Sequence, residues 1–235
     1  MDANKICFIL CVNYELYTQE AIYYINNLTI PDGFTVDILT VLEASGMAAG
    51  YNEAMAQTDA KYKVYLHQDV FIIEPDFIKH LVHLFQDPNI GMIGMVGSPK
   101  FPDHGIMWYG ERIGRIYSCN IDHVIDARFD PVSDPAKPYQ EVEAIDGLLI
   151  ATQYDVKWRE DVFKKWDFYD VSQSFEFRKK GYQLVIPKME KPWCIHDNGM
   201  LSLTNYYNER LTFLKEYGFE NTALPPGAAV NNNTR

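Results

Sequence analysis

The feature that most constrains the fold is a regular alternation of short apolar runs with stretches of helical periodicity. The apolar runs, rich in β-branched residues, occupy residues 5–12, 35–42, 63–66 and 90–96. Between them, apolar residues recur at helical spacing over residues 18–28, 47–55 and 74–85. Strands that alternate with helices in this way form a mostly parallel sheet flanked by helices. The sequence therefore predicts an α/β fold of the Rossmann-like kind.

The length of 235 residues suits one large α/β domain, which we assign to residues 1–221. Residues 97–140, rich in Gly, Pro and aromatic residues, break the alternation and predict an ordered insertion or lid. The two apolar runs on either side of Asp146-Gly147 then predict a tight hairpin. A helix, a strand and a C-terminal helix complete the domain. Residues 222–235, with Pro-Pro-Gly and Asn-Asn-Asn, predict a disordered tail.

The charge of the chain limits its partners. The formal net charge of -11 argues against binding to nucleic acid or to an anionic membrane by bulk electrostatics. A phosphate ligand must instead be held locally, by a divalent cation on carboxylates or by a helix N-terminus. There is no leader pattern and no run of about 18 apolar residues, so we expect no transmembrane segment and a cytoplasmic location. The 4 cysteines form no CxxC pair and are expected to be reduced thiols of the core.

The strongest local signal for chemistry is the sequence His67-Gln68-Asp69, which follows a buried strand. In open α/β sheets, ligands bind at the carboxyl ends of the strands. Asp69 is therefore a candidate to contact a ligand. The alternative is that this residue only caps a turn, because Asp is common in turns for structural reasons.

The order of two motifs resembles the GT-A glycosyltransferases, specifically family 2 and a bacterial glycosyltransferase-like group related to a streptomycin-biosynthesis protein. Ala48-Ala49-Gly50-Tyr51-Asn52 precedes the strand that ends at His67-Gln68-Asp69, as an Asn in a small-residue helix precedes the DxD-type motif of that family. The resemblance covers residues 5–200. It implies a GT-A fold, a nucleoside diphosphate sugar donor, and a Mn²⁺ or Mg²⁺ ion held by Asp69.

The resemblance also implies the remaining donor-site residues. Asn52, His67, Gln68 and Asp69 would lie at the nucleotide and its diphosphate, and Glu43 would contact the nucleotide base or ribose. His67 stands where the family has its first acid, so fewer carboxylates face the metal. An imidazole in that place could ligate the ion, hydrogen-bond a phosphate, or serve the structure alone.

A second family motif occurs as Trp166-Asp167-Phe168-Tyr169-Asp170. The resemblance makes Asp170 the general base that deprotonates the acceptor hydroxyl, with Tyr169 in place of the usual Glu. An Asp before a helix is also a favoured N-cap, held ionised by the helix dipole, so capping is the alternative role.

A third motif spans residues 193–199 and contains His196-Asp197. The resemblance implies that His196 is a further ligand of the metal, with Asp197 as a second choice of ligand. The alternative is a polar loop without a ligand.

The resulting hypothesis is the inverting transfer of a sugar from a nucleoside diphosphate sugar to a glycan or another hydroxyl acceptor. The substitution of the first acid and the presence of Tyr169 leave two rivals open. One is a non-catalytic GT-A-like module that binds a nucleotide or glycan within a larger assembly, and the other is a structural interaction protein. In the insertion, Phe101, Trp108 and Tyr109 could stack on a sugar, but we expect them first to form a small core of their own.

Overall fold

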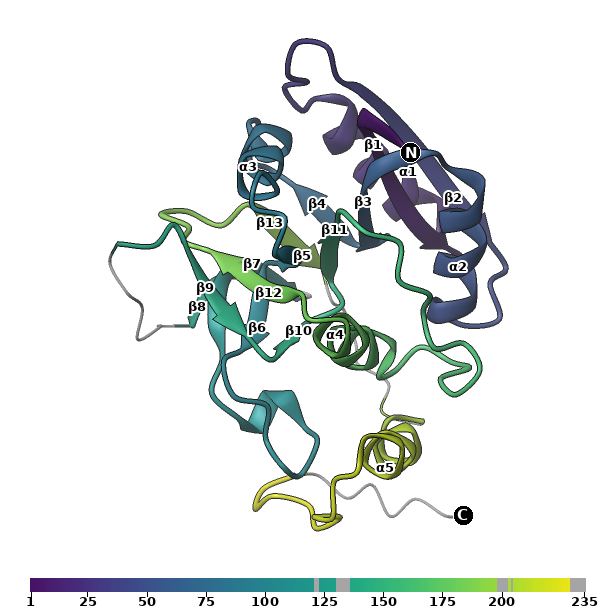
Figure 1. Ribbon diagram of the computed structural model, residues 1–235, viewed down its shortest axis with the longest axis vertical. Helices are drawn as coiled ribbons and strands as arrows, with labels where there is room; N and C mark the ends of the chain where they lie inside the picture. Colours follow the sequence, from purple (N-terminus) through teal and green to yellow (C-terminus); the bar gives the residue numbers. More distant parts are fainter. Residues whose placement is uncertain (121–122, 130–135, 198–202, 204, 229–235) are drawn as a thin grey trace.

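The computed structural model describes residues 1–120, 123–129, 136–197, 203 and 205–228 (Figure 1). The strands are β1 (Asp2–Val12), β2 (Thr35–Leu42), β3 (Ala60–His67), β4 (Val70–Ile72), β5 (Ile90–Gly94), β6 (Val96–Ser98), β7 (Ile113–Asn120), β8 (His123–Phe129), β9 (Tyr139–Val142), β10 (Ala144–Ile145), β11 (Leu149–Thr152), β12 (Gln183–Pro187) and β13 (Cys194–Asp197). The helices are α1 (Glu15–Asn26), α2 (Met47–Gln57), α3 (Phe77–Leu84), the 3-10 helix η1 (Met107–Tyr109), α4 (Tyr169–Lys179) and α5 (Tyr206–Tyr217).

The main sheet has seven strands in the order β2-β1-β3-β11-β5-β12-β9. β1 pairs in parallel with both β2 and β3, and β12 pairs in parallel with β5. β11 runs antiparallel between β3 and β5, and β9 lies antiparallel to β12 at the edge. This mostly parallel sheet with its flanking helices confirms the predicted α/β class.

The two faces of the main sheet are covered by different helices. Ile6, Phe8 and Leu10 of β1 belong to the core cluster that also contains buried residues of α1 and α3. Cys7 and Ile9 point the other way, into the cluster that contains buried residues of α2 and α4. This alternation is the period of two that a strand buried on both faces requires. Cys7, Cys11 and Cys194 are buried thiols, as predicted, whereas Cys119 is only partly buried.

The segment 97–140 contributes most of a second sheet. That sheet has the order β10-β6-β7-β13-β4, with β8 paired to β7. β7 and β8 form an antiparallel ribbon that starts at Gly114 opposite Phe129, and β7 also pairs in parallel with β13. The strands in the described residues of this segment are therefore part of the sheet structure. The segment lies next to the last strand of the chain, β13.

The predicted hairpin at Asp146-Gly147 is wrong. β10, before the pair, joins β6 of the second sheet, whereas β11, after it, enters the main sheet. The sequence pattern was that of a turn, but the two flanking runs find partners that are distant in the sequence. Asp146-Gly147 is therefore the crossing between the two sheets. It lies next to the start of α4, because the Gly147 N–H donates to the carboxylate of Asp170.

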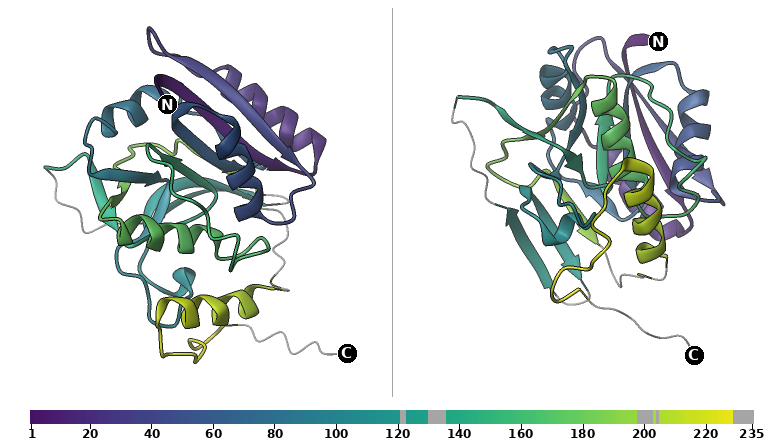
Figure 2. Two further views of the ribbon diagram at one scale, coloured as in Figure 1. Left: turned by 45° about the vertical axis from the view of Figure 1, so that its right-hand side comes forward. Right: turned by 60° about the horizontal axis from the view of Figure 1, so that its bottom comes forward.

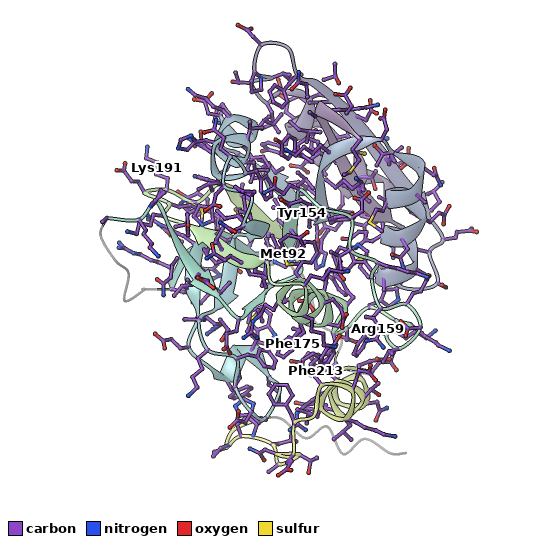
Figure 3. The ribbon with its side chains drawn as sticks, in the orientation of Figure 1. Met92, Tyr154, Arg159, Phe175, Lys191 and Phe213 are labelled. Atoms are coloured by element: carbon purple, nitrogen blue, oxygen red, sulfur yellow. The ribbon has the colours of Figure 1, made fainter. Side chains whose placement is uncertain are left out.

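A third core cluster joins the insertion to the C-terminal helix. The ring of Phe101 lies 5.5 Å from that of Phe213 in α5, and Phe175 of α4 lies 5.2 Å from Phe213. Figures 1 and 2 show α5 beside α4, and Figure 3 marks Phe175 and Phe213 where the two helices meet. Phe101 is thus a core residue, whereas Trp108 and Tyr109 are 45% and 48% exposed.

The segment after α5 begins with ordered contacts. Arg210 of α5 is buried, and its guanidinium donates to the carbonyls of His104, Thr222 and Ala223. Residues 222–228 therefore lie against α5 and the insertion, while residues 229–235 of the predicted tail lie outside the described part of the chain. None of the helices in the described part is long and apolar enough to cross a membrane.

Candidate active site

The carboxyl ends of β1 and β3 lie side by side and carry the first group of polar residues. Cys11 of β1 is in register with His67 of β3, so the residues that follow both strands meet at one edge of the sheet. The side-chain oxygen of Gln68 accepts hydrogen bonds from the backbone N–H groups of Asn13 and Tyr14, each at 2.9 Å. Its amide nitrogen donates to Asn13 Oδ1 at 2.5 Å. Gln68 therefore fixes the two strand ends to each other.

A pocket of about 220 Å³ opens at this edge. Its lining comes from the ends of β1, β2 and β3, the start of α2, and the segment before α4: Cys11, Val12, Asn13, Glu43, Ala44, Met47, His67, Gln68, Asp69 and Trp166. Glu43 has a left-handed backbone (φ 53°), which is unusual for a residue with a side chain and occurs often at functional sites. The structure thus brings Glu43, His67, Gln68 and Asp69 to one pocket.

His67, Asp69 and His196 form a cluster at the same edge. His67 Nδ1 lies 3.9 Å from Asp69 Oδ1, and His196 Nε2 lies 3.7 Å from the same oxygen. One ligand atom from each residue lies within 4.8 Å of the other two. These separations are too long for direct hydrogen bonds. They leave room for a cation between two imidazole nitrogens and one carboxylate oxygen.

His196 reaches the cluster through the second sheet. β13 pairs antiparallel with β4, which follows Asp69 in the chain, and His196 is in register with Val70. The N–H of Asp197 donates to the backbone carbonyl of Asp69 at 2.9 Å, and Tyr17 donates its hydroxyl to the Asp197 carboxylate at 3.1 Å. Asp197, our second choice of ligand, is thus engaged with Tyr17. Residues 198 and 199 of this motif lie outside the described residues.

The electrostatics of the cluster suit a cation. Burial lowers the pKa of His67 to about 3, helped by the neighbouring His196, and burial lowers the pKa of His196 to about 4. Both imidazoles are therefore neutral and can offer a lone pair. Burial raises the pKa of Asp69 to about 6, and its Oδ1 is buried without a hydrogen-bond partner among the described residues. A divalent cation would satisfy that oxygen, so the donor set fits a metal.

Asp170 is not among the residues that line the pocket, and it lies in the first turn of α4 rather than at the helix cap. The N-cap is Phe168, whose backbone is left-handed (φ 58°) and whose side chain makes no capping bond. The alternative role of Asp170 as the N-cap is therefore wrong. Asp170 Oδ2 accepts a 2.8 Å hydrogen bond from the Gly147 N–H instead. The expected lowering of its pKa by the helix dipole is also wrong, because burial raises this pKa to about 6.

Two further residues of this region were assigned little or no role by the sequence. The hydroxyl of Tyr169 lies 2.5 Å from His67 Nε2. Asp146 is buried with one carboxylate oxygen unpartnered in the described part, and burial, followed by the charge of Asp170, raises its pKa to about 7. The signal for Tyr169 was its place in the motif before Asp170, where an acid was expected. No local pattern indicated its contact with His67, which is 102 residues away in the chain.

Asn52 does not join the other predicted donor residues. Its amide nitrogen donates to the carbonyl of Trp158 at 2.9 Å, and its amide oxygen accepts from the N–H of Trp158 at 2.9 Å. Both ends of the side chain are therefore used to hold the backbone of the segment before α4. Asn52 is also not among the residues that line the pocket.

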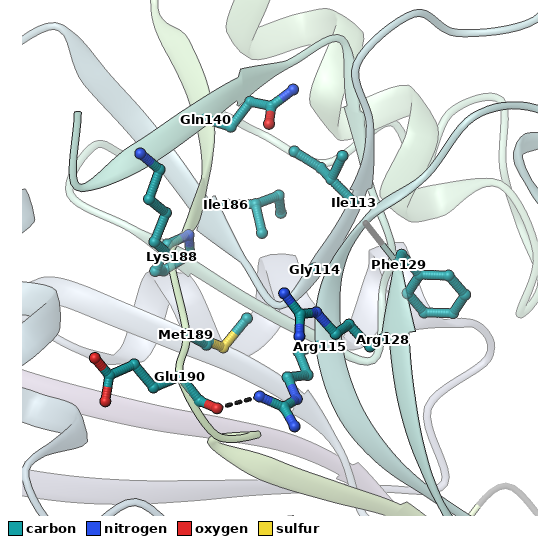
Figure 4. Close-up of a pocket in the computed structure, with 11 residues that line it drawn as sticks. Ile113, Gly114, Arg115, Arg128, Phe129, Gln140, Ile186, Lys188, Met189 and Glu190 are labelled. Atoms are coloured by element: carbon teal, nitrogen blue, oxygen red, sulfur yellow. Dashed lines mark hydrogen bonds between the residues drawn. The ribbon is translucent and has the colours of Figure 1, made fainter. Parts of the chain in front are cut away.

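A larger cavity of about 600 Å³ lies between the β7–β8 ribbon and the segment after β12 (Figure 4). The cationic side chain of Arg115 faces it but is engaged within the protein, since its Nε donates to Asp126 Oδ1 at 2.8 Å and its guanidinium also contacts the carbonyl of Glu190. The lining contains none of the predicted site residues, so the smaller pocket at Asp69 is the better candidate for the reaction site.

Comparisons with known proteins identify the family and the fold of the chain. The sequence model of a glycosyltransferase-like family matches residues 7–217, whereas a comparison with curated proteins finds no match. Among solved structures, the mannosyltransferase PcManGT from Pyrobaculum calidifontis, in complex with GDP-Man and Mn²⁺, is similar with a TM-score of 0.54 at 14% identity, over 95% of this chain and 66% of that one.

TarS from S. aureus is similar with a TM-score of 0.55 at 11% identity, over 93% of this chain and 40% of that one. A shorter TarS chain, residues 1–349 in complex with UDP-GlcNAc, has a TM-score of 0.54 at 10% identity, over 93% of this chain and 68% of that one. The chain thus spans 40% to 68% of these similar chains. At such low identity the likeness establishes the fold and no more.

Proposed function

Because the chain belongs to the glycosyltransferase-like family that matches its residues 7–217, we propose that it transfers a hexosyl group from a nucleoside diphosphate sugar to an acceptor hydroxyl. The observation that carries the proposal is the cluster of His67, Asp69 and His196 beside the pocket at the ends of β1, β2 and β3. In open α/β sheets this edge binds the ligand. The solved complexes of similar fold hold GDP-Man or UDP-GlcNAc, which supports a donor of this class.

The chain's own residues divide the donor site between them. His67, Asp69 and His196 would hold a divalent cation, which when bound supplies positive charge to stabilise the departing diphosphate. Two imidazole nitrogens favour a transition ion such as Mn²⁺ over Mg²⁺, because Mg²⁺ prefers oxygen ligands. Gln68 holds the backbone of Asn13 and Tyr14 in place, and Glu43, which lines the pocket, would contact the nucleotide.

Asp170 is the general base of this proposal. The Gly147 N–H positions one of its carboxylate oxygens, and a pKa of about 6 makes the carboxylate a stronger base than an ordinary Asp while keeping it mostly ionised at pH 7. Deprotonation of the acceptor hydroxyl by Asp170 permits direct attack on the anomeric carbon. Inversion of configuration then follows, as in a single displacement.

Turnover of a donor panel tests the proposal. The protein is incubated with UDP-GlcNAc, GDP-Man and other nucleoside diphosphate sugars in Mn²⁺, with simple glycan acceptors, and the released nucleoside diphosphate is measured. We expect one donor to be consumed, faster with Mn²⁺ than with Mg²⁺, and to be consumed slowly by water without an acceptor. No consumption of any donor would contradict the enzymatic proposal.

A second candidate is a nucleotide- or glycan-binding module without activity. It is favoured by one observation: two positions that are acidic in the family hold His67 and Tyr169, and these two side chains bind each other at 2.5 Å. Donor binding without turnover in the panel would support the module. Failure to bind any nucleotide would support a structural interaction protein.

A further inference from the structure

The contact between Tyr169 and His67 places a hydroxyl on one nitrogen of a proposed metal ligand while the other nitrogen faces the carboxylate. Tyr169 Oη lies 2.5 Å from His67 Nε2. On the opposite side of the ring, His67 Nδ1 faces Asp69 Oδ1 at 3.9 Å. His67 can therefore take part in the cluster only through Nδ1.

A neutral imidazole carries one N–H, and this proton decides which nitrogen can bind a cation. Ligation through Nδ1 requires the proton to be on Nε2. In that tautomer the Nε2–H group donates a hydrogen bond to the Tyr169 oxygen. We propose that Tyr169 is a positioning residue that fixes the Nε2–H tautomer of His67 and thereby presents the Nδ1 lone pair to the cation. The proposal rests on the metal site of the proposed function and assigns a role to the residue that replaces the expected acid.

The hydroxyl of Tyr169 is held where it is by dense packing. The Tyr169 ring lies 5.9 Å from that of Tyr51 and 6.0 Å from that of Trp158. The side chain of Asn52 in turn forms two hydrogen bonds with the backbone of Trp158. At Gly147 there is no room for a side chain, since a methyl group there would collide with Tyr169 Oη. The phenol is therefore a rigid partner that keeps the imidazole ring in one orientation.

A purely structural hydrogen bond would also pack these residues, so the test needs a readout of the metal. In Tyr169→Phe the ring stays and only the hydroxyl is lost. We expect Mn²⁺ affinity, measured by electron paramagnetic resonance of free Mn²⁺, to fall about 10- to 100-fold, as for other partners of metal-bound histidines. The matched control is Tyr51→Phe, because the Tyr51 hydroxyl is buried in the same aromatic cluster without a hydrogen-bond partner in the described part. This control should retain wild-type affinity.

Two further measurements do not require the Tyr169→Phe variant to fold. In the Zn²⁺-loaded wild-type protein, nitrogen NMR of the His67 ring should show the proton on Nε2. Gly147→Ala keeps the tyrosine but displaces its hydroxyl, so it should weaken Mn²⁺ binding in the same direction.

Unchanged Mn²⁺ affinity in Tyr169→Phe would overturn the role of Tyr169 alone. A proton on Nδ1 in the Zn²⁺-loaded protein would remove His67 from the ligand set, and the role of Tyr169 with it. Absence of Mn²⁺ and Zn²⁺ binding in the wild-type protein would overturn the proposed metal site, and this inference with it.

Discussion

The candidate site has two parts, each with a partly buried carboxylate. We call the part at Asp69 the donor flank and the part at Asp170 the acceptor flank, after the substrates that we propose for them. On the donor flank, Asp69 is partly buried and its Oδ1 has no hydrogen-bond partner among the described residues. On the acceptor flank, Asp170 has a similarly raised pKa, but its carboxylate accepts the N–H of Gly147. Both carboxylates have a pKa of about 6 because of burial.

Only one of the two flanks lacks a partner for its carboxylate. An unpartnered buried carboxylate oxygen destabilises the protein until something satisfies it, and two neutral histidines face the same oxygen. The donor flank is therefore where we propose that a cation binds. On the acceptor flank the carboxylate of Asp170 already accepts a backbone hydrogen bond, as the base that we propose would need for its positioning.

The largest effect is expected from Asp170→Asn, which removes the base and leaves the donor flank intact. Turnover in the donor panel should fall about 10²- to 10⁴-fold, while the Kd of the nucleoside diphosphate stays near the wild-type value. Asp167→Asn is the matched control, because Asp167 is a half-buried acid of the same motif that lies before the helix. Near-normal turnover in Asp170→Asn would reject this residue as the base.

Asp69→Asn should act on the other flank. It removes the charge that the two histidines face, so Mn²⁺ affinity should fall by at least about 10- to 100-fold, the loss seen even for residues outside the ligand set. Isothermal titration with Mn²⁺ measures it. Asp197→Asn is the control, since its carboxylate is bound to Tyr17. A loss in Asp197→Asn with none in Asp69→Asn would move the ligand to Asp197.

The pH dependence of turnover separates the flanks further. Asp170 acts as a base only when ionised, and its pKa is about 6. At saturating Mn²⁺, kcat/KM should therefore be constant above about pH 7 and fall about tenfold per unit below pH 6. The histidines add nothing to this profile because they stay neutral above a pKa of about 3 or 4. If kcat/KM of Asp170→Asn showed the same decrease at low pH, the decrease would belong to another titrating group.

The smallest effect on the site is expected from Asn52→Ala. Both amide ends of Asn52 bind the Trp158 backbone, so the change should reduce the free energy of unfolding by about 1–3 kcal/mol. The Kd of a nucleoside diphosphate should not change. Denaturant unfolding and nucleotide titration check both statements. A large loss of nucleotide affinity in a variant with normal stability would restore Asn52 to the donor site.

The sequence predicted the regions whose contacts are local and repetitive. The strands around residues 5–12, 35–42 and 63–66 were recognised as continuous apolar, β-branched runs, and β1, β2 and β3 confirm them. β1 and β3 are largely buried, whereas the edge strand β2 is mostly half-buried. Asp69 was found because it ends such a run. Its role as a metal ligand stays a prediction.

The features that the sequence did not predict depend on distant partners. The run before Asp146-Gly147 pairs with β6 and the run after it with β3 and β5, so local turn chemistry gave the wrong connection. Asp170 had the pattern of an N-cap, but Phe168 begins the helix with a left-handed backbone. Tertiary packing decided both cases, as it often overrides local preference.

In the proposed reaction, a cation on His67, Asp69 and His196 binds the diphosphate of the donor. This role of the cation is tested most directly by titrating the wild-type protein with UDP and with GDP, in Mn²⁺ and in EDTA. We predict binding of at least one nucleotide in Mn²⁺ and its loss in EDTA, because the net charge of -11 provides no bulk positive field for a diphosphate. Equal affinity with and without the metal would contradict this role.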